Sequence, residues 1–280
     1  MIPPSLIIDP LLIAWLQEDL GRGDRTTDGL ELQKMGSGQW VAKAEGIMAG
    51  LPIAQRVFQL LNPKIEFIPV VEEGQRVKTG QVVATFNGSL SALLTGERVA
   101  LNLAMRLSGI ATMTRQYTEI IADLPTQLVD TRKTTPGLRI LEKYGIRVGG
   151  AKNHRMALDD GVMIKDNHIK AAGSIQEAIQ RIRPTIPYPL TIEVETTTLE
   201  EVKEALMYGA DIIMLDNMNL DLMKEAVSYI RGENKQIKIE ASGNITLDNI
   251  RQVALTGVDY ISSSAPITRS TWLDLSMRLD

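Results

Sequence analysis

The sequence predicts an α/β protein, with an α+β layer first and a closed or nearly closed β/α barrel after it. Short β-rich runs separated by turns dominate the first part of the 280 residues. In the second part, strand-like runs alternate with helical patterns, which is typical of a parallel sheet with right-handed crossovers. At least six such units favour a barrel. A doubly wound open sheet is the alternative, disfavoured because no Gly-x-Gly-x-x-Gly follows the first strand.

The first part begins with an amphipathic helix predicted over Pro10–Leu20, where apolar residues recur at helical spacing. A second helix is predicted near Ile53–Leu61. Residues Ser89–Ala122 are apolar and rich in helix formers, and Gly109 is expected to break that segment. The β-rich runs between Gly, Pro and Asn turns are Trp40–Ala44, Ile65–Val70 and Val82–Phe86.

The second part alternates strands with helices. The predicted strands are Leu128–Asp130, Val162–Ile164, Leu190–Val194, Asp211–Leu215, Ile237–Ile239 and Val258–Ile261. The helices between them are predicted over Ser174–Ile182, Leu199–Tyr208, Leu220–Ile230 and Leu247–Leu255. In a barrel of this kind the carboxyl ends of the strands meet at one rim, which carries the chemistry.

The composition is that of an ordinary soluble globular protein, with 44% hydrophobic and 23% charged residues. The longest apolar runs, such as Leu11–Leu16, are far too short to span a bilayer, and no basic, apolar leader opens the chain. We therefore expect a cytoplasmic protein with no membrane partner. The absence of cysteine excludes disulfides, thiol nucleophiles and cysteine metal sites.

Both histidines, His154 and His168, lie within the segment Asp130–Ile169, which is rich in arginine and lysine. The whole chain nevertheless has a net charge of -4. A cationic focus on an acidic protein predicts a pocket for a small, multiply charged anion. A nucleic-acid groove would need a wider basic face, so we expect no nucleic-acid partner.

Every predicted strand end is polar. The six ends are Asp130–Lys133, Lys165–His168, Glu193–Glu195, Asp216–Asn217, Glu240–Asn244 and Ser262–Ser264. The first two are cationic, the next two are acidic, and the last two are small and neutral. Each of the last two precedes a possible helix start, where exposed N–H groups favour phosphate. The set suits a phosphorylated sugar with a metal-chelated leaving group, beside a second anionic reactant.

Other interpretations of these residues stay open. Lys165 follows an apolar run and is also suited to forming an imine, as in an aldolase-type lyase. His168 is suited to capping the next helix. Glu193 and Glu195 share one face of a strand, so Glu195 is expected nearer the rim and Glu193 deeper, as a structural partner. A non-enzymatic anion sensor or scaffold would carry the same cationic loop.

The chain resembles the quinolinate phosphoribosyltransferase family nearly from end to end. The motifs that carry the resemblance are Glu18–Asp24, Glu97–Arg98 with Asn102, Leu107–Thr112, Asp130–Arg139, Gly149–Gly150, Asn153–Arg155, Lys165–His168, Glu193–Glu195, Leu215–Asn217 and Ala241–Asn244. The central block, Asp130-Thr-Arg-Lys-Thr-Thr-Pro-Gly-Leu-Arg139, is highly specific.

The resemblance implies an N-terminal α/β sandwich domain, residues 1–110, followed by an incomplete (β/α) barrel, residues 111–265, with the tail 266–280 packing back on the first domain. It also implies phosphoribosyl transfer from phosphoribosyl pyrophosphate to quinolinate with decarboxylation. The products would be nicotinate mononucleotide, pyrophosphate and CO2, a step of de novo NAD biosynthesis. Family members of this kind are carboxylating nicotinate-nucleotide diphosphorylases, which are pentosyltransferases.

The resemblance further assigns roles to residues. Quinolinate would be bound by Arg98, Arg132, His154, Arg155 and Lys165. Phosphoribosyl pyrophosphate would be bound by Lys133, Glu195, Asp216, Ser242, Gly243, Asn244, Ser263 and Ser264. The catalytic residues would be Lys133, Lys165, Glu195 and Asp216, and Glu195 and Asp216 would hold Mg2+ directly or indirectly. The protein would be a homodimer in which Arg98 enters the site of the neighbouring subunit.

The chain departs from the family pattern at two places in the phosphate site. Asn244 stands where many relatives have the second glycine of Ser-Gly-Gly, and Ser264 replaces the glycine of a Gly-Ala pair. A related phosphoribosyltransferase-like family, associated with molybdate transport, shares much of the fold and is the nearest alternative.

Overall fold

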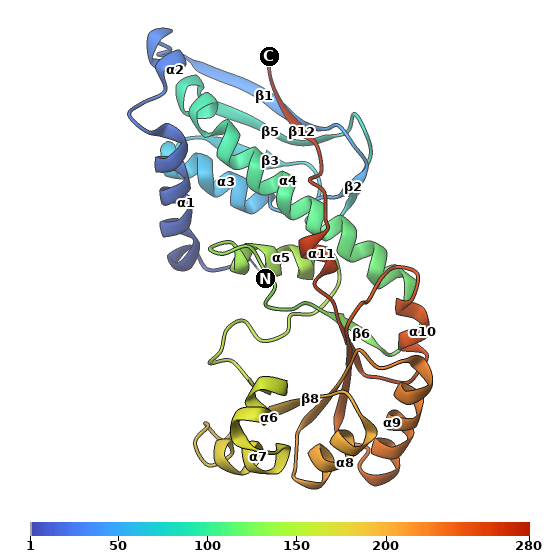
Figure 1. The fold of residues 1–280 in the computed structure, drawn as a ribbon. Helices are drawn as coiled ribbons and strands as arrows, with labels where there is room; N and C mark the ends of the chain where they lie inside the picture. Colours follow the sequence, from blue (N-terminus) through green and yellow to red (C-terminus); the bar gives the residue numbers. More distant parts are fainter. Residues whose placement is uncertain (1) are drawn as a thin grey trace. The chain divides into compact units, whose positions relative to one another are not determined.

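The computed structural model describes residues 2–280, which form two compact units. The first unit holds the chain up to Arg115, together with Thr135–Gly150 and Arg269–Asp280. The second holds Gln116–Thr134 and Ala151–Thr268. In Figure 1 the blue and green elements and the red C-terminal strand belong mostly to the first unit, and the yellow and orange elements to the second.

The first unit is built on a four-stranded antiparallel sheet in the order β12-β1-β5-β3. Its strands are β1 (Met35–Ala42), β3 (Glu66–Pro69), β5 (Val82–Ser89) and β12 (Leu275–Leu279). A separate short ribbon pairs β2 (Gly46–Ile47) with β4 (Arg76–Val77). The helices are α1 (Ser5–Leu20), α2 (Arg25–Gly29), α3 (Leu51–Leu61), α4 (Leu90–Ile120, whose last turn lies in the second unit) and α5 (Arg139–Val148).

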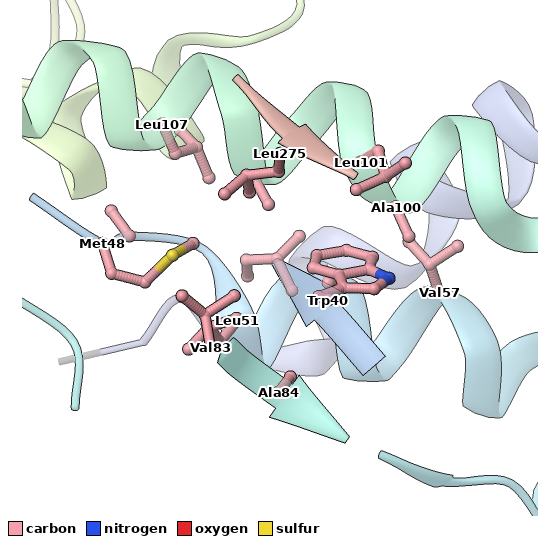
Figure 2. Close-up of a cluster of buried hydrophobic side chains, with 14 of the residues drawn as sticks. Trp40, Met48, Leu51, Val57, Val83, Ala84, Ala100, Leu101, Leu107 and Leu275 are labelled. Carbon is pink, nitrogen blue, oxygen red and sulfur yellow. The ribbon is translucent and has the colours of Figure 1, made fainter. Parts of the chain in front are cut away.

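The core of this unit lies between the sheet and its helices. Trp40 of β1, Phe58 of α3 and Phe67 of β3 form an aromatic group, with the ring centroids of Trp40 and Phe67 5.1 Å apart. Leu101 and Leu107 of α4 and Leu275 of β12 belong to the same buried cluster (Figure 2). Burial of large aromatic and aliphatic side chains is the dominant stabilising term for such a layer.

Gly109 does not break its helix, contrary to the prediction. Helix α4 runs through it without interruption. A Cβ on Gly109 would lie 1.9 Å from the backbone oxygen of Thr271, so the glycine lets the C-terminal segment approach the helix closely. Close approach of another backbone is a reason for glycine that a propensity argument does not distinguish from a helix break.

The second unit contains a six-stranded parallel sheet in the order β6-β11-β10-β9-β8-β7. The strands are β6 (Gln127–Val129), β7 (Val162–Ile164), β8 (Ile192–Thr196), β9 (Ile212–Asp216), β10 (Lys238–Ser242) and β11 (Tyr260–Ser262). The helices are α6 (Asp166–Ala172), α7 (Ile175–Ile182), α8 (Leu199–Met207), α9 (Leu220–Glu233), α10 (Ile250–Ala254) and α11 (Ala265–Thr268).

This strand order supports an incomplete barrel. From β7 to β11 each strand lies beside the next in the chain, so the sheet winds in one direction without the reversal of a doubly wound sheet. β6, the first strand, lies beside the last, and its Val129 forms an isolated parallel bridge to Lys152. Within residues 2–280 no ladder joins β7 to β6, so the barrel stays open there. The predicted α/β class is confirmed.

The units depart from the predicted division at residue 110 most of all in one segment. The segment Thr135–Gly150, which the sequence placed in the barrel, belongs to the first unit. Its helix α5 buries Leu141 and Tyr144 in the core cluster of that unit, and its Glu142 accepts hydrogen bonds from Arg106 of α4. Arg139, the last residue of the specific motif block, is the first residue of this helix.

The C-terminal tail returns to the first unit, where β12 pairs with β1. Across residues 2–280, no helix combines the length and the apolar character needed to cross a bilayer.

Candidate active site

The register of the parallel sheet brings the polar strand ends together. Glu195 of β8 and Glu240 of β10 both lie level with Met214 of β9, and Asp216 lies level with Ser242. Neighbours in register share a face, and residues two apart on a strand do too. One face of the sheet therefore carries Glu193, Glu195, Asp216, Glu240 and Ser242. Of these, Glu195, Asp216 and Ser242 lie nearest the carboxyl ends of their strands.

Lys165 and Glu195 form an ion pair at this edge. Lys165 follows β7, and its Nζ contacts Oε2 of Glu195. Lys165 is half-buried and Glu195 is mostly buried. An ion pair with a carboxylate engages the lysine amine, whereas an imine-forming lysine needs its amine free to attack a carbonyl. The contact therefore favours an electrostatic role for Lys165.

Asp216 ends β9 beside two asparagines in unusual backbone conformations. Asn217 Nδ2 donates to Asp216 Oδ2 at 2.7 Å, and Asn244 Nδ2 donates to Asn217 Oδ1 at 3.0 Å. Asn217 and Asn244 have φ values of 54° and 51°, in the left-handed region that asparagine tolerates better than most residues. Asn244 is thus linked to Asp216 through the side chain of Asn217.

Gly243 lies between these groups and has no room for a side chain. Its φ is 96°, and a Cβ there would lie 2.2 Å from Oδ1 of Asn217. The segment after it does not start a helix directly, because α10 begins only at Ile250. The predicted helix is present but begins three residues after its expected start at Leu247. Asn249 closes the loop before it: its Nδ2 donates to the Asn244 carbonyl, and its Oδ1 accepts from the N–H of Thr246.

Ser263 and Ser264 follow β11 and precede the short helix α11. Ser263 is buried, and its backbone N–H donates to Val129 O at 3.1 Å. Its Oγ accepts from the N–H of Ala265. Ser264 is half-buried, and its carbonyl accepts from the backbone N–H groups of Ile267 and Thr268. These contacts close the turn at the end of the strand.

His154 lies against two buried glutamates. Its Nε2 is 3.0 Å from Oε2 of Glu193 and 3.5 Å from Oε2 of Glu240. Burial disfavours a charged ring, but the hydrogen bonds and charges of the two glutamates oppose that effect and raise the pKa of His154. The backbone N–H of His154 and the side chain of Asn153 both donate to buried Asp130.

Arg155 and Arg132 supply positive charge in the same unit. Arg155 Nη1 donates to the carbonyl of Gly161 at 2.8 Å. Burial, and then the charge of Arg132, lower the pKa of Arg155, and Glu193 opposes them. Arg132 has a buried Nε–H that finds no hydrogen-bond partner among residues 2–280. Two guanidinium groups that influence each other are suited to a ligand with two carboxylates.

Three other predicted residues have different surroundings. Lys133 follows Arg132 and is exposed. Arg98 is exposed on α4, in the first unit. His168 caps α6: its Nδ1 accepts from the N–H of Lys165 at 3.0 Å. The capping interpretation of His168 is therefore confirmed.

Glu195 and Asp216 fit a magnesium ion by their chemistry. Both offer carboxylate oxygens, which Mg2+ prefers, and both lie on neighbouring strands at one edge. Each has one carboxylate oxygen without a hydrogen bond in the described part of the chain. A second group, His154 with Glu193 and Glu240, brings potential ligand atoms within 4.8 Å of one another. Its buried nitrogen and oxygen donors suit a transition metal better than Mg2+.

Two residues of the site were assigned no role by the sequence argument. Glu240 was grouped with a neutral strand end, and Asp130 was quoted only within a motif. Asp130 directly follows β6, and Glu240 is the central residue of β10. An acidic residue in a buried strand rarely lies there without a partner. This rule could have marked both residues as members of the site.

Two family models match the chain. The model of the C-terminal domain of quinolinate phosphoribosyl transferase matches residues 110–278, and that of the N-terminal domain matches residues 24–108.

The chain belongs to the quinolinate phosphoribosyltransferase family.

Relatives of this family cover almost the whole chain. A protein of Synechocystis sp., named as a probable carboxylating nicotinate-nucleotide pyrophosphorylase, is 64% identical over 278 residues, which is 99% of this chain and 94% of that protein. A Bacillus subtilis protein of the same name is 44% identical, covering 97% of this chain and 93% of its own length. The crystal structure of NadC from Streptococcus pyogenes superposes with a TM-score of 0.95 at 41% identity, covering 100% of this chain and 99% of that one.

Proposed function

We propose that this quinolinate phosphoribosyltransferase family member transfers phosphoribose from phosphoribosyl pyrophosphate to quinolinate and releases pyrophosphate and CO2. The product is nicotinate mononucleotide, an intermediate in NAD biosynthesis. The single observation that supports it best is the sorting of charge at one strand edge: Lys165 meets Glu195, and Asp216 ends the neighbouring strand. Relatives named as carboxylating nicotinate-nucleotide pyrophosphorylases support the same assignment.

The bond-forming step needs no general base. The pyridine nitrogen of quinolinate carries no proton at neutral pH, so its lone pair can attack C1 of the ribose while the bond from C1 to pyrophosphate breaks. Catalysis then depends on position and charge. The carboxylates of Glu195 and Asp216 stabilise positive charge that develops on the ribose. Lys133 and Lys165 stabilise the departing pyrophosphate. When bound, Mg2+ neutralises pyrophosphate charge.

Decarboxylation follows from the product of that step. The new bond makes the ring a pyridinium, and CO2 leaves from C2 because the electron pair left behind lies beside the positive nitrogen. A proton from solvent then replaces the carboxylate at C2. Arg132 and Arg155 hold the substrate carboxylates through charge-assisted hydrogen bonds, and Arg98, His154 and Lys165 complete that binding set.

The phosphate and assembly assignments belong to the same proposal. Backbone and side chains of Ser242–Asn244 and of Ser263–Ser264 bind the 5′-phosphate of the ribose. The active protein is a homodimer in which Arg98 enters the neighbouring site, and it acts in the cytoplasm.

A pyrophosphate-release assay with quinolinate and with nicotinate in parallel tests this function. We expect release with quinolinate and phosphoribosyl pyrophosphate together, dependent on Mg2+, with CO2 in equal amount. Activity on nicotinate alone would assign the chain to a different phosphoribosyltransferase, and tight anion binding without release would make it a sensor. Borohydride treatment with substrate is expected to leave no adduct on Lys165, since an imine lyase would be trapped.

A further inference from the structure

Two glutamates are buried on the face of the sheet that carries the proposed site. Glu193 of β8 and Glu240 of β10 flank β9, and they are 2% and 3% exposed. Each has one carboxylate oxygen, Oε1, that is buried without a hydrogen bond in the described part of the chain. Buried carboxylates are costly unless a partner compensates them. A binding site for a dianion makes their presence still more unfavourable, since like charges repel.

The compensating partner is the ring of His154. Its Nε2 faces Oε2 of both glutamates, at 3.0 Å from Glu193 and 3.5 Å from Glu240. Its Nδ1 accepts a hydrogen bond from the backbone N–H of Arg155 at 2.7 Å. With Nδ1 facing the N–H of Arg155, Nε2 is the ring nitrogen that donates toward the carboxylates.

These contacts connect the glutamates to Arg155. The carboxylates hold one edge of the imidazole, and the other edge holds the backbone of the next residue. The guanidinium of Arg155 has its own contact to Gly161, so its position depends on where its backbone lies. If the ring turned, the Nδ1 contact would be lost and the base of the Arg155 side chain would be free to shift. Small displacements of a binding group weaken substrate binding strongly.

We propose that Glu193 and Glu240 are positioning residues for quinolinate, which act through the His154 ring to hold Arg155 in its binding position. The inference rests on the proposed function and deepens it, because it adds two residues that touch neither substrate. Holding the His154 ring explains why Glu193 and Glu240 are present although their charges repel the dianion quinolinate. A purely electrostatic role predicts the opposite effect on quinolinate binding.

The test compares the KM values of both substrates in Glu240→Leu, which removes the acceptor and the charge. We expect the KM for quinolinate to rise about tenfold or more and the KM for phosphoribosyl pyrophosphate to stay within about twofold. Glu240→Gln is expected to recover most of the loss, because its amide oxygen can still accept from Nε2 of His154. Glu177→Leu, an exposed glutamate on α7, is the matched control and should change neither value.

A double-mutant cycle with His154→Ala shows whether the glutamates act through the ring. In that background Glu240→Leu should add less than about a twofold change. The proposal would be overturned if the effects of His154→Ala and Glu240→Leu on the quinolinate KM multiplied in the double variant. So would tighter quinolinate binding in Glu240→Leu, or a parallel rise of both KM values. A transition metal that copurifies at one equivalent and is lost in Glu240→Leu would also overturn it, since the carboxylates would then be ligands.

If Glu240→Leu does not fold, the doubly isosteric variant Glu193→Gln with Glu240→Gln takes its place. It keeps the side-chain shapes and removes both charges. Two neutral amides hold the ring more weakly than carboxylates do, and no carboxylate remains in this variant. We then expect a rise of about threefold or more in the quinolinate KM, which disappears in the His154→Ala background. A lower quinolinate KM would overturn the proposal. Failure of the proposed function is distinguishable, because the unmodified protein would then release no pyrophosphate with quinolinate.

Discussion

At the scale of single residues, Arg132 contains a buried Nε–H with no hydrogen-bond partner among residues 2–280. An unsatisfied buried donor of this kind costs about 1–3 kcal/mol. In a site for a dianion, a substrate carboxylate is the group that would satisfy it. The cost is then part of a binding site that is complete only when its ligand is present.

We therefore predict opposite effects of Arg132→Ala on stability and on binding. The unliganded variant should be as stable as the parent or slightly more stable. Its affinity for quinolinate should fall by roughly 10- to 100-fold, the range expected for a lost charge-assisted hydrogen bond. Thermal melting with and without quinolinate, together with calorimetric titration, measures both quantities. Unchanged affinity for quinolinate would remove Arg132 from the site.

At the scale of elements, Gly109 decides how closely the C-terminal segment approaches α4. A Cβ there would lie 1.9 Å from Thr271 O, and this oxygen belongs to the backbone, which cannot turn aside as a side chain would. The contact lies within the first unit, whose β12 completes the sheet. Replacing Gly109 by alanine should therefore disturb the packing of the C-terminal tail, although it raises the intrinsic helix propensity of α4.

Gly109→Ala is predicted to destabilise the protein by about 1–3 kcal/mol, the usual cost of overpacking, although alanine is the better helix former. Urea unfolding followed by circular dichroism measures the change. Gly29→Ala in the same unit is the control, because a Cβ there meets nothing within 4 Å. A stabilised Gly109→Ala variant would show that the tail does not pack as described.

The ion pair of Asp123 and Arg251 connects α10 to the segment after α4. Arg251 Nη1 and Nη2 contact the two carboxylate oxygens of Asp123 at 2.8 and 2.9 Å. The hydrogen bond with Arg251 lowers the pKa of Asp123 to about 2. The pKa of the folded state lies below the ordinary value, so the pair stabilises the fold above about pH 4. That contribution is lost as the pH falls toward 2.

Asp123→Asn should accordingly lower the melting temperature slightly at neutral pH, because an exposed pair contributes little. The difference from the parent should shrink as the pH falls from 4 to 2. Melting curves over this range measure it, with Asp221→Asn, at an exposed pair within α9, as the control. A difference that does not depend on pH in the acid range would contradict the assignment.

At the scale of the whole molecule, our proposal assigns Arg98 to the site of a neighbouring subunit. Arg98 is exposed on α4 in the first unit, whereas Arg132, Arg155 and Lys165 belong to the second. An exposed arginine can contact a neighbouring subunit. Such an arrangement allows two inactive chains to complement each other.

Mixing Arg98→Ala chains with Lys165→Ala chains is predicted to restore activity. Each variant alone should be nearly inactive. In a mixed dimer one site receives both lesions and the other receives neither, so random reassortment should restore roughly a quarter of the parent activity. Pyrophosphate release after unfolding and joint refolding of the two chains measures it. No recovery, with mixed dimers demonstrated by mass, would place Arg98 in its own subunit's site.

Much of this architecture could be predicted from local patterns. Alternating apolar runs and helical segments predicted the parallel sheet, because a parallel strand is buried on both faces and its apolar run is visible in the chain. The polar strand ends predicted the rim, since the carboxyl ends of parallel strands meet at one edge. The motif block from Asp130 to Arg139 pointed to the family that its relatives confirm. These features depend on residues close together in the sequence.

Only the tertiary structure decided the rest. Helix α5 joined the first unit because Leu141 and Tyr144 pack in its core, a contact between distant segments. The ring of His154 met Glu193 and Glu240 because β8, β9 and β10 lie side by side in a fixed register. Gly109 proved to be a close-packing position because Thr271, 162 residues later, lies against it. Periodicity shows which way a side chain faces, but long-range packing determines which side chain it meets.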